Sequence, residues 1–120
     1  MYKYVDISSL VGMTFVKVEA AVGSDVMTLT CSTGEVYQFL HEQSCCENVQ
    51  IEDLDNEKDV LVGSPLLVAE ERISDAATDE DESATWTFYT FATVKGTLTV
   101  RWLGTSNGCY SESVSLVRVH

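Results

Sequence analysis

Two long runs of strand-forming residues with a very short connection constrain the fold of this chain more than any other feature. Residues 84–94 and 97–104 are rich in threonine, aromatic and β-branched residues, and only Lys95-Gly96 separates them. Such runs around a two-residue turn predict an antiparallel β-hairpin. A turn centred on Lys95-Gly96 also sets the register, because directly opposite residues share a face of the sheet. This register pairs Tyr89 with Trp102 and Phe91 with Val100 on one face, and Phe88 with Leu103 and Thr90 with Arg101 on the other.

Apolar and polar residues alternate through most of the remaining sequence. Hairpin-length turns join three strands in a meander, which we expect at residues 14–21, 26–31 and 35–41. Further along we expect strands at 49–53, 66–70 and about 110–119, and a short helix at 57–61 capped by Asn56. The sequence therefore predicts a mostly β fold of seven or eight strands. An antiparallel meander of this kind closes as a small barrel or a two-layer sandwich, with at most one or two short helices.

Length and composition predict one folded domain. A chain of 120 residues is long enough for one apolar core and too short for two. Its hydrophobic fraction of 45% is well above that of disordered chains, even at a net charge of -12. No apolar run approaches the roughly 18 residues of a membrane span, and the residues after Met1 lack the apolar core of a signal peptide. We therefore expect a cytoplasmic protein without a membrane partner.

The acidic residues are concentrated in one part of the chain. Residues 42–82 hold fourteen of the nineteen acids, with only Lys58 and Arg72 as basic residues, so this stretch carries a charge of -12. A broad contact with a phosphate backbone needs many lysines and arginines. We therefore expect no direct binding to nucleic acid. Residues 83–120 contain Glu112 against three basic residues, which leaves room for a local anion site.

The cysteines and histidines form no recognisable catalytic or metal motif. Cys45 and Cys46 are adjacent and no Cys-x-x-Cys is present, so their spacing with His41 is poor for zinc. Adjacent cysteines bond to each other only with strain, and without a secretion signal we expect reduced thiols. A pair of His41 with either cysteine lacks an orienting third residue and an oxyanion hole. We therefore expect no enzyme, no metal and no cofactor.

Aromatic residues and one arginine share a face of the predicted hairpin. An aromatic surface can stack a planar base, and a guanidinium can bind a phosphate through two hydrogen bonds. The alternative is an aromatic core from which Arg101 merely extends to the surface. Trp86, Phe88, Thr90 and Arg101 lie on this face, with Asn107 and Tyr110 near the open end of the hairpin. Of these, the candidate ligand-binding residues are Trp86, Phe88, Arg101, Asn107 and Tyr110.

Several polar motifs lie in loops and at strand ends, where binding residues are common. They are residues 41–49 (HEQSCCENV), Gly63-Ser64-Pro65 with Ala69-Glu70-Glu71, 86–96 (WTFYTFATVKG), Arg101-Trp102 and 106–112 (SNGCYSE). From about residue 13 to residue 112 the chain resembles a family of small bacteriophage proteins whose shared domain has no assigned function. The resemblance implies a phage accessory gene expressed in the bacterial cytoplasm. It also adds His41, Glu42 and Cys45 to the candidate ligand site.

The resemblance favours binding over catalysis, because phage accessory proteins without an active site often act by occupancy. The first hypothesis is a protein that sequesters a nucleotide-derived signalling molecule of host immunity, in a pocket that a homodimer or higher homo-oligomer could complete. The alternative is an inhibitor of a host protein, for which residues 42–82 would mimic the charge of nucleic acid. A third possibility is a virion or assembly component.

Overall fold

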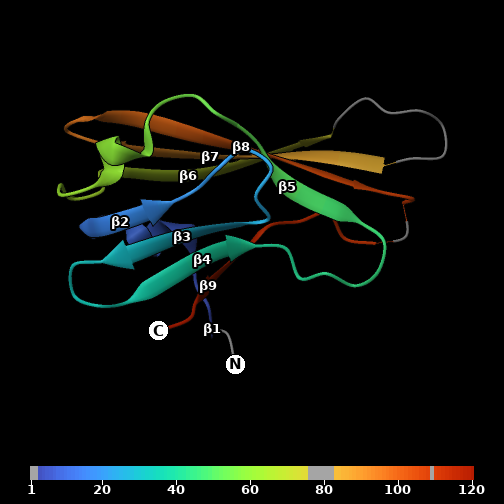
Figure 1. Cartoon of the computed structure of the whole chain (residues 1–120), viewed down its shortest axis with the longest axis horizontal. Coiled ribbons are helices and arrows are strands. Elements are labelled where there is room, and N and C mark those ends of the chain that lie inside the picture. Colours follow the sequence, from blue (N-terminus) through green and yellow to red (C-terminus); the bar gives the residue numbers. More distant parts are fainter. Residues whose placement is uncertain (1–2, 76–82, 109) are drawn as a thin grey trace.

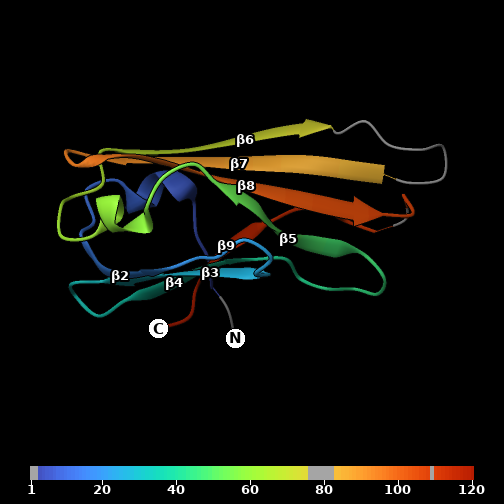
Figure 2. The ribbon, with the colours of Figure 1, turned by 45° about the horizontal axis from the view of Figure 1, so that its top comes forward.

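The protein folds as a two-layer β-sandwich (Figures 1 and 2). The computed structural model describes residues 3–75, 83–108 and 110–120. One sheet has five strands in the spatial order β1-β9-β4-β3-β2, and the other has four in the order β5-β8-β7-β6. All pairings between these strands are antiparallel. The predicted mostly β class is confirmed, and of its two forms the sandwich is present, since neither sheet closes into a barrel.

The sheets are built from nine strands in the described part of the chain. The five-stranded sheet contains β1 (Lys3–Tyr4), β2 (Phe15–Glu19), β3 (Val26–Cys31), β4 (Val36–Leu40) and β9 (Ser115–Arg118). The four-stranded sheet contains β5 (Asn48–Leu54), β6 (Val68–Asp75), β7 (Ser83–Thr93) and β8 (Gly96–Ser106). Two 3-10 turns, η1 (Ile7–Leu10) and η2 (Lys58–Leu61), lie between the layers at one end (Figure 2). Neither of these four-residue helices is long enough to cross a bilayer.

Alternation in the sequence correctly predicts the meander β2-β3-β4. The bounds of β3 are those expected, and its side chains alternate between buried and half-buried positions along the strand. Strands β2 and β4 begin and end within two residues of the expected positions. The inward residues of all three strands therefore face the second sheet.

Aromatic side chains fill the space between the two sheets. Phe39 of β4 lies with its ring centroid 4.6 Å from that of Tyr89 and 5.7 Å from that of Phe91, both on β7. Trp102 of β8 is fully buried beside them. Full burial of such a side chain stabilises a fold by about 1.5–3 kcal/mol. Successive side chains of a strand point to opposite faces of the sheet, so the residues between these buried positions of β7 and β8 point outward.

The long hairpin β7–β8 is present, but its register differs from the predicted one by two residues. A shift of two residues keeps each side chain on its predicted face, so the two sets of facing residues were correct although the pairs were wrong. Arg101 lies opposite Phe88 instead of Thr90. The observed pairs are Tyr89 with Val100, Phe91 with Leu98, Phe88 with Arg101, and Thr90 with Thr99.

The position of the turn explains this shift. The turn is centred on Val94-Lys95, because Gly96 already belongs to β8 and lies opposite Thr93. The Thr93 hydroxyl accepts a hydrogen bond from the Lys95 N–H at 3.1 Å, which stabilises the turn locally. Gly96 has φ of +152°, a conformation that residues with a Cβ rarely adopt. The glycine is therefore needed at the start of the strand and not within the turn.

The expected helix and its cap are only partly correct. The helix is the single 3-10 turn η2, and Glu57 occupies its N-cap without a side-chain hydrogen bond. Asn56, the predicted cap, instead donates from Nδ2 to the Thr97 carbonyl at 3.0 Å. Asn56 therefore ties this loop to β8, a partner that local sequence could not reveal.

The bounds of two further strands, β6 and β9, also differ from the prediction. Strand β6 extends to Asp75 because it pairs along β7 over eight residues. The last strand, β9, is limited to Ser115–Arg118, because the preceding residues fold back against β8. Strand β1 and helix η1 were not predicted.

Candidate functional site

The outward face of the four-stranded sheet carries two arginines placed over two aromatic rings. The Cζ atom of Arg72 lies 4.9 Å from the ring centroid of Phe88. The Cζ atom of Arg101 lies 4.9 Å from the centroid of Trp86, and the two rings are 6.4 Å apart. We call these four residues the aromatic–arginine face.

Three neighbouring strands deliver these side chains to one surface. Arg72 on β6 lies opposite Phe88 on β7, which in turn lies opposite Arg101 on β8. Trp86 precedes Phe88 by two residues and shares its side of the strand. A guanidinium over an aromatic ring at a partly exposed site gains about 0.5–1 kcal/mol. The rings therefore help to hold both guanidinium groups in place.

Much of the hydrogen-bonding capacity of these arginines is unused. Arg101 Nη2 lies 3.8 Å from Asp53 Oδ2, which is too long for a hydrogen bond. Its Nε is buried and has no partner among the described residues. The Arg72 guanidinium likewise lies over the Phe88 ring and forms no hydrogen bond with another described residue. Because a guanidinium has five N–H donors, this face can still bind an anion.

A hollow of about 680 Å³ adjoins the face at the edge strand β6. Thr90 and Thr99, which lie directly opposite each other, add two hydroxyl groups to its wall. Pockets for small ligands typically measure about 300–1,000 Å³. The lining consists of Glu70, Arg72, Phe88, Thr90 and Thr99, together with Ile7, Ala69 and Glu71 around the strand edge.

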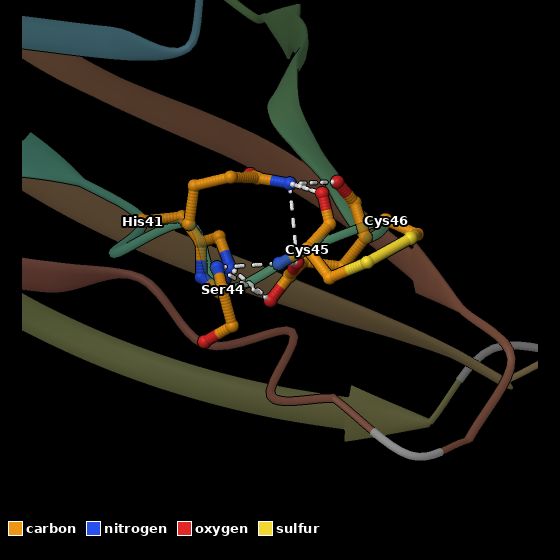
Figure 3. Close-up of a disulfide and its surroundings, with 6 residues drawn as sticks. His41, Ser44, Cys45 and Cys46 are labelled. Atoms are coloured by element: carbon orange, nitrogen blue, oxygen red, sulfur yellow. Dashed lines mark hydrogen bonds and ion pairs between the residues drawn. A yellow bond between two sulfur atoms is a disulfide. The ribbon is translucent and has the colours of Figure 1, made fainter.

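The polar loop between β4 and β5 encloses a buried carboxylate (Figure 3). Glu47 is 4% exposed, and its Oε1 accepts hydrogen bonds from the Cys45 N–H at 2.7 Å and from Gln43 Nε2 at 3.1 Å. The Ser44 N–H lies 3.3 Å from both carboxylate oxygens. These donors, above all the Cys45 amide, favour the charged form and lower the pKa of Glu47 from 4.5 to about 2.

His41 ties this loop to the segment that precedes β9. Its Nδ1 lies 2.7 Å from the Ser113 carbonyl oxygen, and its Nε2 lies 3.1 Å from Glu47 Oε2. Both partners are hydrogen-bond acceptors, so each ring nitrogen faces an oxygen atom of the protein. The imidazole is therefore engaged in holding the loop and presents neither nitrogen as a base.

The expectation of reduced thiols at Cys45 and Cys46 is wrong, because a disulfide joins them (Figure 3). The tight loop holds the two residues in place, since Cys45 donates its N–H to Glu47 and accepts from Gln43 Nε2 at 3.1 Å. Neither sulfur in this state is a thiolate nucleophile or ligand. Throughout the described residues, no three histidine, cysteine or acidic side chains gather as metal ligands would.

A second carboxylate is buried where the chain leaves β8. Glu112 is 8% exposed and accepts hydrogen bonds from the hydroxyl groups of Thr85, at 2.7 Å, and Ser106. A Cβ at Gly104 would lie 2.6 Å from the Glu112 carbonyl oxygen, so only glycine allows the segment to approach β8 this closely. Both buried carboxylates thus organise loop structure.

Comparison with known families gives one match, which covers residues 8–116 and is described as a domain of unknown function, DUF7448. The chain belongs to this family. No curated protein and no solved structure matches it. The part of the DUF7448 domain that matches includes the aromatic–arginine face and both loop carboxylates.

In this DUF7448 domain the eight predicted ligand residues occupy three places. His41 shares no contact partner with Arg101, because its ring nitrogens bind Glu47 and Ser113. The structure therefore unites the three hairpin residues, and it ties His41 to its own loop and to the segment that precedes β9. Trp86, Phe88 and Arg101 lie on the aromatic–arginine face, the loop after β4 holds His41, Glu42 and Cys45, and Asn107 and Tyr110 follow β8.

The second arginine of the face is the functional residue that sequence reasoning missed. The predicted strand ended at Glu70, although the polar alternation continues through Arg72 to Ser74. Extending the predicted strand to Ser74 would have included Arg72, but its place beside Phe88 depends on the pairing of β6 with β7. The alternative of an aromatic core does not hold for Trp86 and Phe88, which are half-buried on the outward side.

The acidic segment between β6 and β7 was expected as a loop over residues 74–83. Ser74 and Asp75 instead belong to β6, and Ser83 belongs to β7. The run from Asp79 to Glu82 lies outside the described residues.

Proposed function

We propose that this DUF7448 protein is a non-enzymatic bacteriophage accessory protein that binds and sequesters a nucleotide-derived signalling molecule of host immunity. The aromatic–arginine face carries the proposal. Two guanidinium groups lie 4.9 Å from two aromatic centroids on one outward surface, and their exposed N–H groups form no hydrogen bond with another described residue. Aromatic rings and free cationic donors together suit a ligand that is planar in one part and anionic in another.

A nucleotide matches this surface in each of its parts. Bases stack on aromatic side chains and on guanidinium planes, at about 1–3 kcal/mol per base. A phosphate takes two parallel hydrogen bonds from an arginine. The hydroxyl groups of Thr90 and Thr99 in the adjoining hollow suit a sugar. A ligand with two phosphates would engage Arg72 and Arg101 together.

The competing hypothesis of a nucleic-acid mimic depends on acidic residues that the structure only partly describes. Several of the acids in residues 42–82 already have partners within the protein, among them Asp55, whose Oδ1 accepts a hydrogen bond from the Thr99 N–H at 2.6 Å. Glu47 is buried in its loop, and Glu71 accepts a hydrogen bond from the Tyr89 hydroxyl at 2.6 Å. No observation on the described residues favours the mimic over the ligand-binding hypothesis.

Ligand binding is tested by thermal shift and calorimetry with AMP, cyclic dinucleotides and cyclic ADP-ribose isomers. A ligand that binds only the folded state raises the unfolding temperature by mass action, and at about 100 μM protein even a modest affinity is detectable. We expect at least one of these compounds to bind and stabilise the wild type. Absence of binding by every compound would contradict the proposal.

Arginine variants locate the site. Arg72→Ala and Arg101→Ala should each weaken binding, whereas Arg118→Ala should not, because Arg118 lies on β9 in the other sheet. Replacing Asp79, Glu80, Asp81 and Glu82 by their amides should leave ligand binding intact. If this fourfold variant loses the protein's activity in infected cells while Arg101→Ala keeps it, the mimic hypothesis is favoured instead.

A further inference from the structure

Strand β6 is the longest uninterrupted sheet edge in the described part of the chain (Figure 2). It pairs with β7 over eight consecutive residues without a register shift, and no strand lies on its other side. The other edges are short or irregular, because β1 has two residues and both β2 and β5 contain a register shift. An unpaired edge offers its N–H and C=O groups to another strand.

The side chains of β6 are complementary to those of a second, antiparallel β6. We propose that two copies of this chain pair through β6, with the two Glu71 residues at the centre. Glu70 of one copy then lies opposite Arg72 of the other, and the same pair recurs on the other side of the two-fold axis. On the inward side, Ile73, which is 58% exposed, lies opposite Ala69. The pairing thus covers an exposed apolar side chain and joins opposite charges.

Neighbouring registers lack this complementarity. A two-fold axis at Glu70 would place the two Glu70 side chains opposite each other, and an axis at Arg72 would do the same for the two arginines. Like charges directly opposite each other destabilise a strand pair. The proposed register also places one like-charged pair, the two Glu71 residues, opposite each other, although each of these carboxylates accepts a hydrogen bond from Tyr89 of its own chain. It is favoured because, of the three registers, only this one adds two pairs of opposite charge, Glu70 with Arg72 on either side of the axis.

Pairing in this way joins the two four-stranded sheets into one continuous sheet. The two-fold axis is perpendicular to the sheet, so both outward faces remain on the same side. The two aromatic–arginine faces then lie side by side across β6. The interface is argued from the edge and its charges and does not depend on the proposed ligand, although both involve Arg72. A guanidinium has five N–H donors, so Arg72 can pair with Glu70 of the second copy through one edge and keep donors for an anion on the other.

Charge reversal tests the interface. The oligomeric state is measured by sedimentation velocity in about 0.15 M salt, because salt at this near-physiological concentration screens long-range repulsion between the acidic chains. The wild type should sediment at twice the 13.2 kDa mass of one chain. Glu70→Arg or Arg72→Glu should each give a monomer, because each places like charges opposite, whereas the double variant should restore the dimer. Glu52→Arg on β5 is the control and should remain dimeric.

A monomeric wild type would overturn the proposal. So would a double variant that is folded by circular dichroism but stays monomeric.

Cysteine cross-linking tests the register. Opposite residues in antiparallel strands have Cα atoms about 4.5–5.5 Å apart, within the range that a disulfide spans. Glu71→Cys should therefore form a covalent dimer under mild oxidation. Ser74→Cys should not, because its two copies lie six residues apart in this register. Faster cross-linking of Ser74→Cys than of Glu71→Cys would contradict the proposed pairing.

Discussion

Arg101 lies over Trp86, and the exposed end of its guanidinium forms no hydrogen bond with another described residue, which makes it the most informative single position for ligand binding. Its side chain is 43% exposed, so Arg101→Ala should change the free energy of unfolding little. The loss of a charge-assisted hydrogen bond of about 1.5–3 kcal/mol should weaken ligand binding about tenfold to a hundredfold. Calorimetry with a bound nucleotide measures this change.

The same position distinguishes a guanidinium from a simple positive charge. Arg101→Lys should bind nearly as weakly as Arg101→Ala, because a lysine cannot form two parallel hydrogen bonds. Full affinity in the lysine variant would show that charge alone is recognised. Arg118→Ala provides the control for removal of an arginine elsewhere.

The buried Glu47 predicts a specific dependence of stability on pH. Its pKa is lowered on folding, so the stability that it contributes is complete above its ordinary pKa of 4.5 and is lost as the pH falls towards about 2. Glu47→Gln should lower the free energy of unfolding at neutral pH, and the difference from the wild type should shrink through that interval. Urea unfolding at a series of pH values measures this difference.

Glu42→Gln is the matched control, because Glu42 lies exposed in the same loop. It should have little effect at any of these pH values. A difference between Glu47→Gln and the wild type that stays constant from pH 4.5 to 2 would contradict the role assigned to the carboxylate.

At the scale of the elements, strands were easier to predict than their partners. Period-two alternation reflects the burial of one face of a strand. It therefore predicted both ends of β3 correctly, and it assigned the residues of β7 and β8 to the correct faces of the sheet. The register of the hairpin depended on its turn. Because Thr93 pairs with Gly96, the centre of the turn lies one residue earlier in the chain than predicted. The length of β6 depended on the strand it pairs with, which is a long-range property.

Close packing of the segment after β8 predicts a large effect at Gly104. Gly104→Ala would place a Cβ 2.6 Å from a backbone oxygen and 2.8 Å from the Cβ of Glu112, so the segment must move. Overpacking of this kind typically costs about 1–3 kcal/mol. Urea unfolding should show that loss, whereas Thr97→Ala at an exposed position of the same strand should cost less than about 1 kcal/mol. Equal stability of both variants would show that the segment yields easily.

At the scale of the whole molecule, the net charge of -12 makes stability depend on salt. Among the described residues, two ion pairs join groups that are both charged at neutral pH, Lys17–Glu19 and Asp53–Arg101, so screening removes more repulsion than attraction. The Debye length falls from about 30 Å at 0.01 M salt to about 3 Å at 1 M, against principal extents of 45, 31 and 21 Å. Thermal unfolding should therefore occur at a higher temperature in sodium chloride at moderate concentration than at low ionic strength. A lower unfolding temperature in salt would mean that attractive pairs dominate.

The sequence by itself determined the β class, the position of the long hairpin and the side of the sheet on which Trp86, Phe88 and Arg101 lie. Each of these follows from residues close together in the chain, because alternation and turn length act locally. Only the tertiary structure decided that Arg72 joins that surface from a third strand. It also decided that His41 is occupied by Glu47 and by Ser113, which is 72 residues away. These contacts join segments distant in sequence, and their geometry is fixed by how the two sheets pack, which no local pattern encodes.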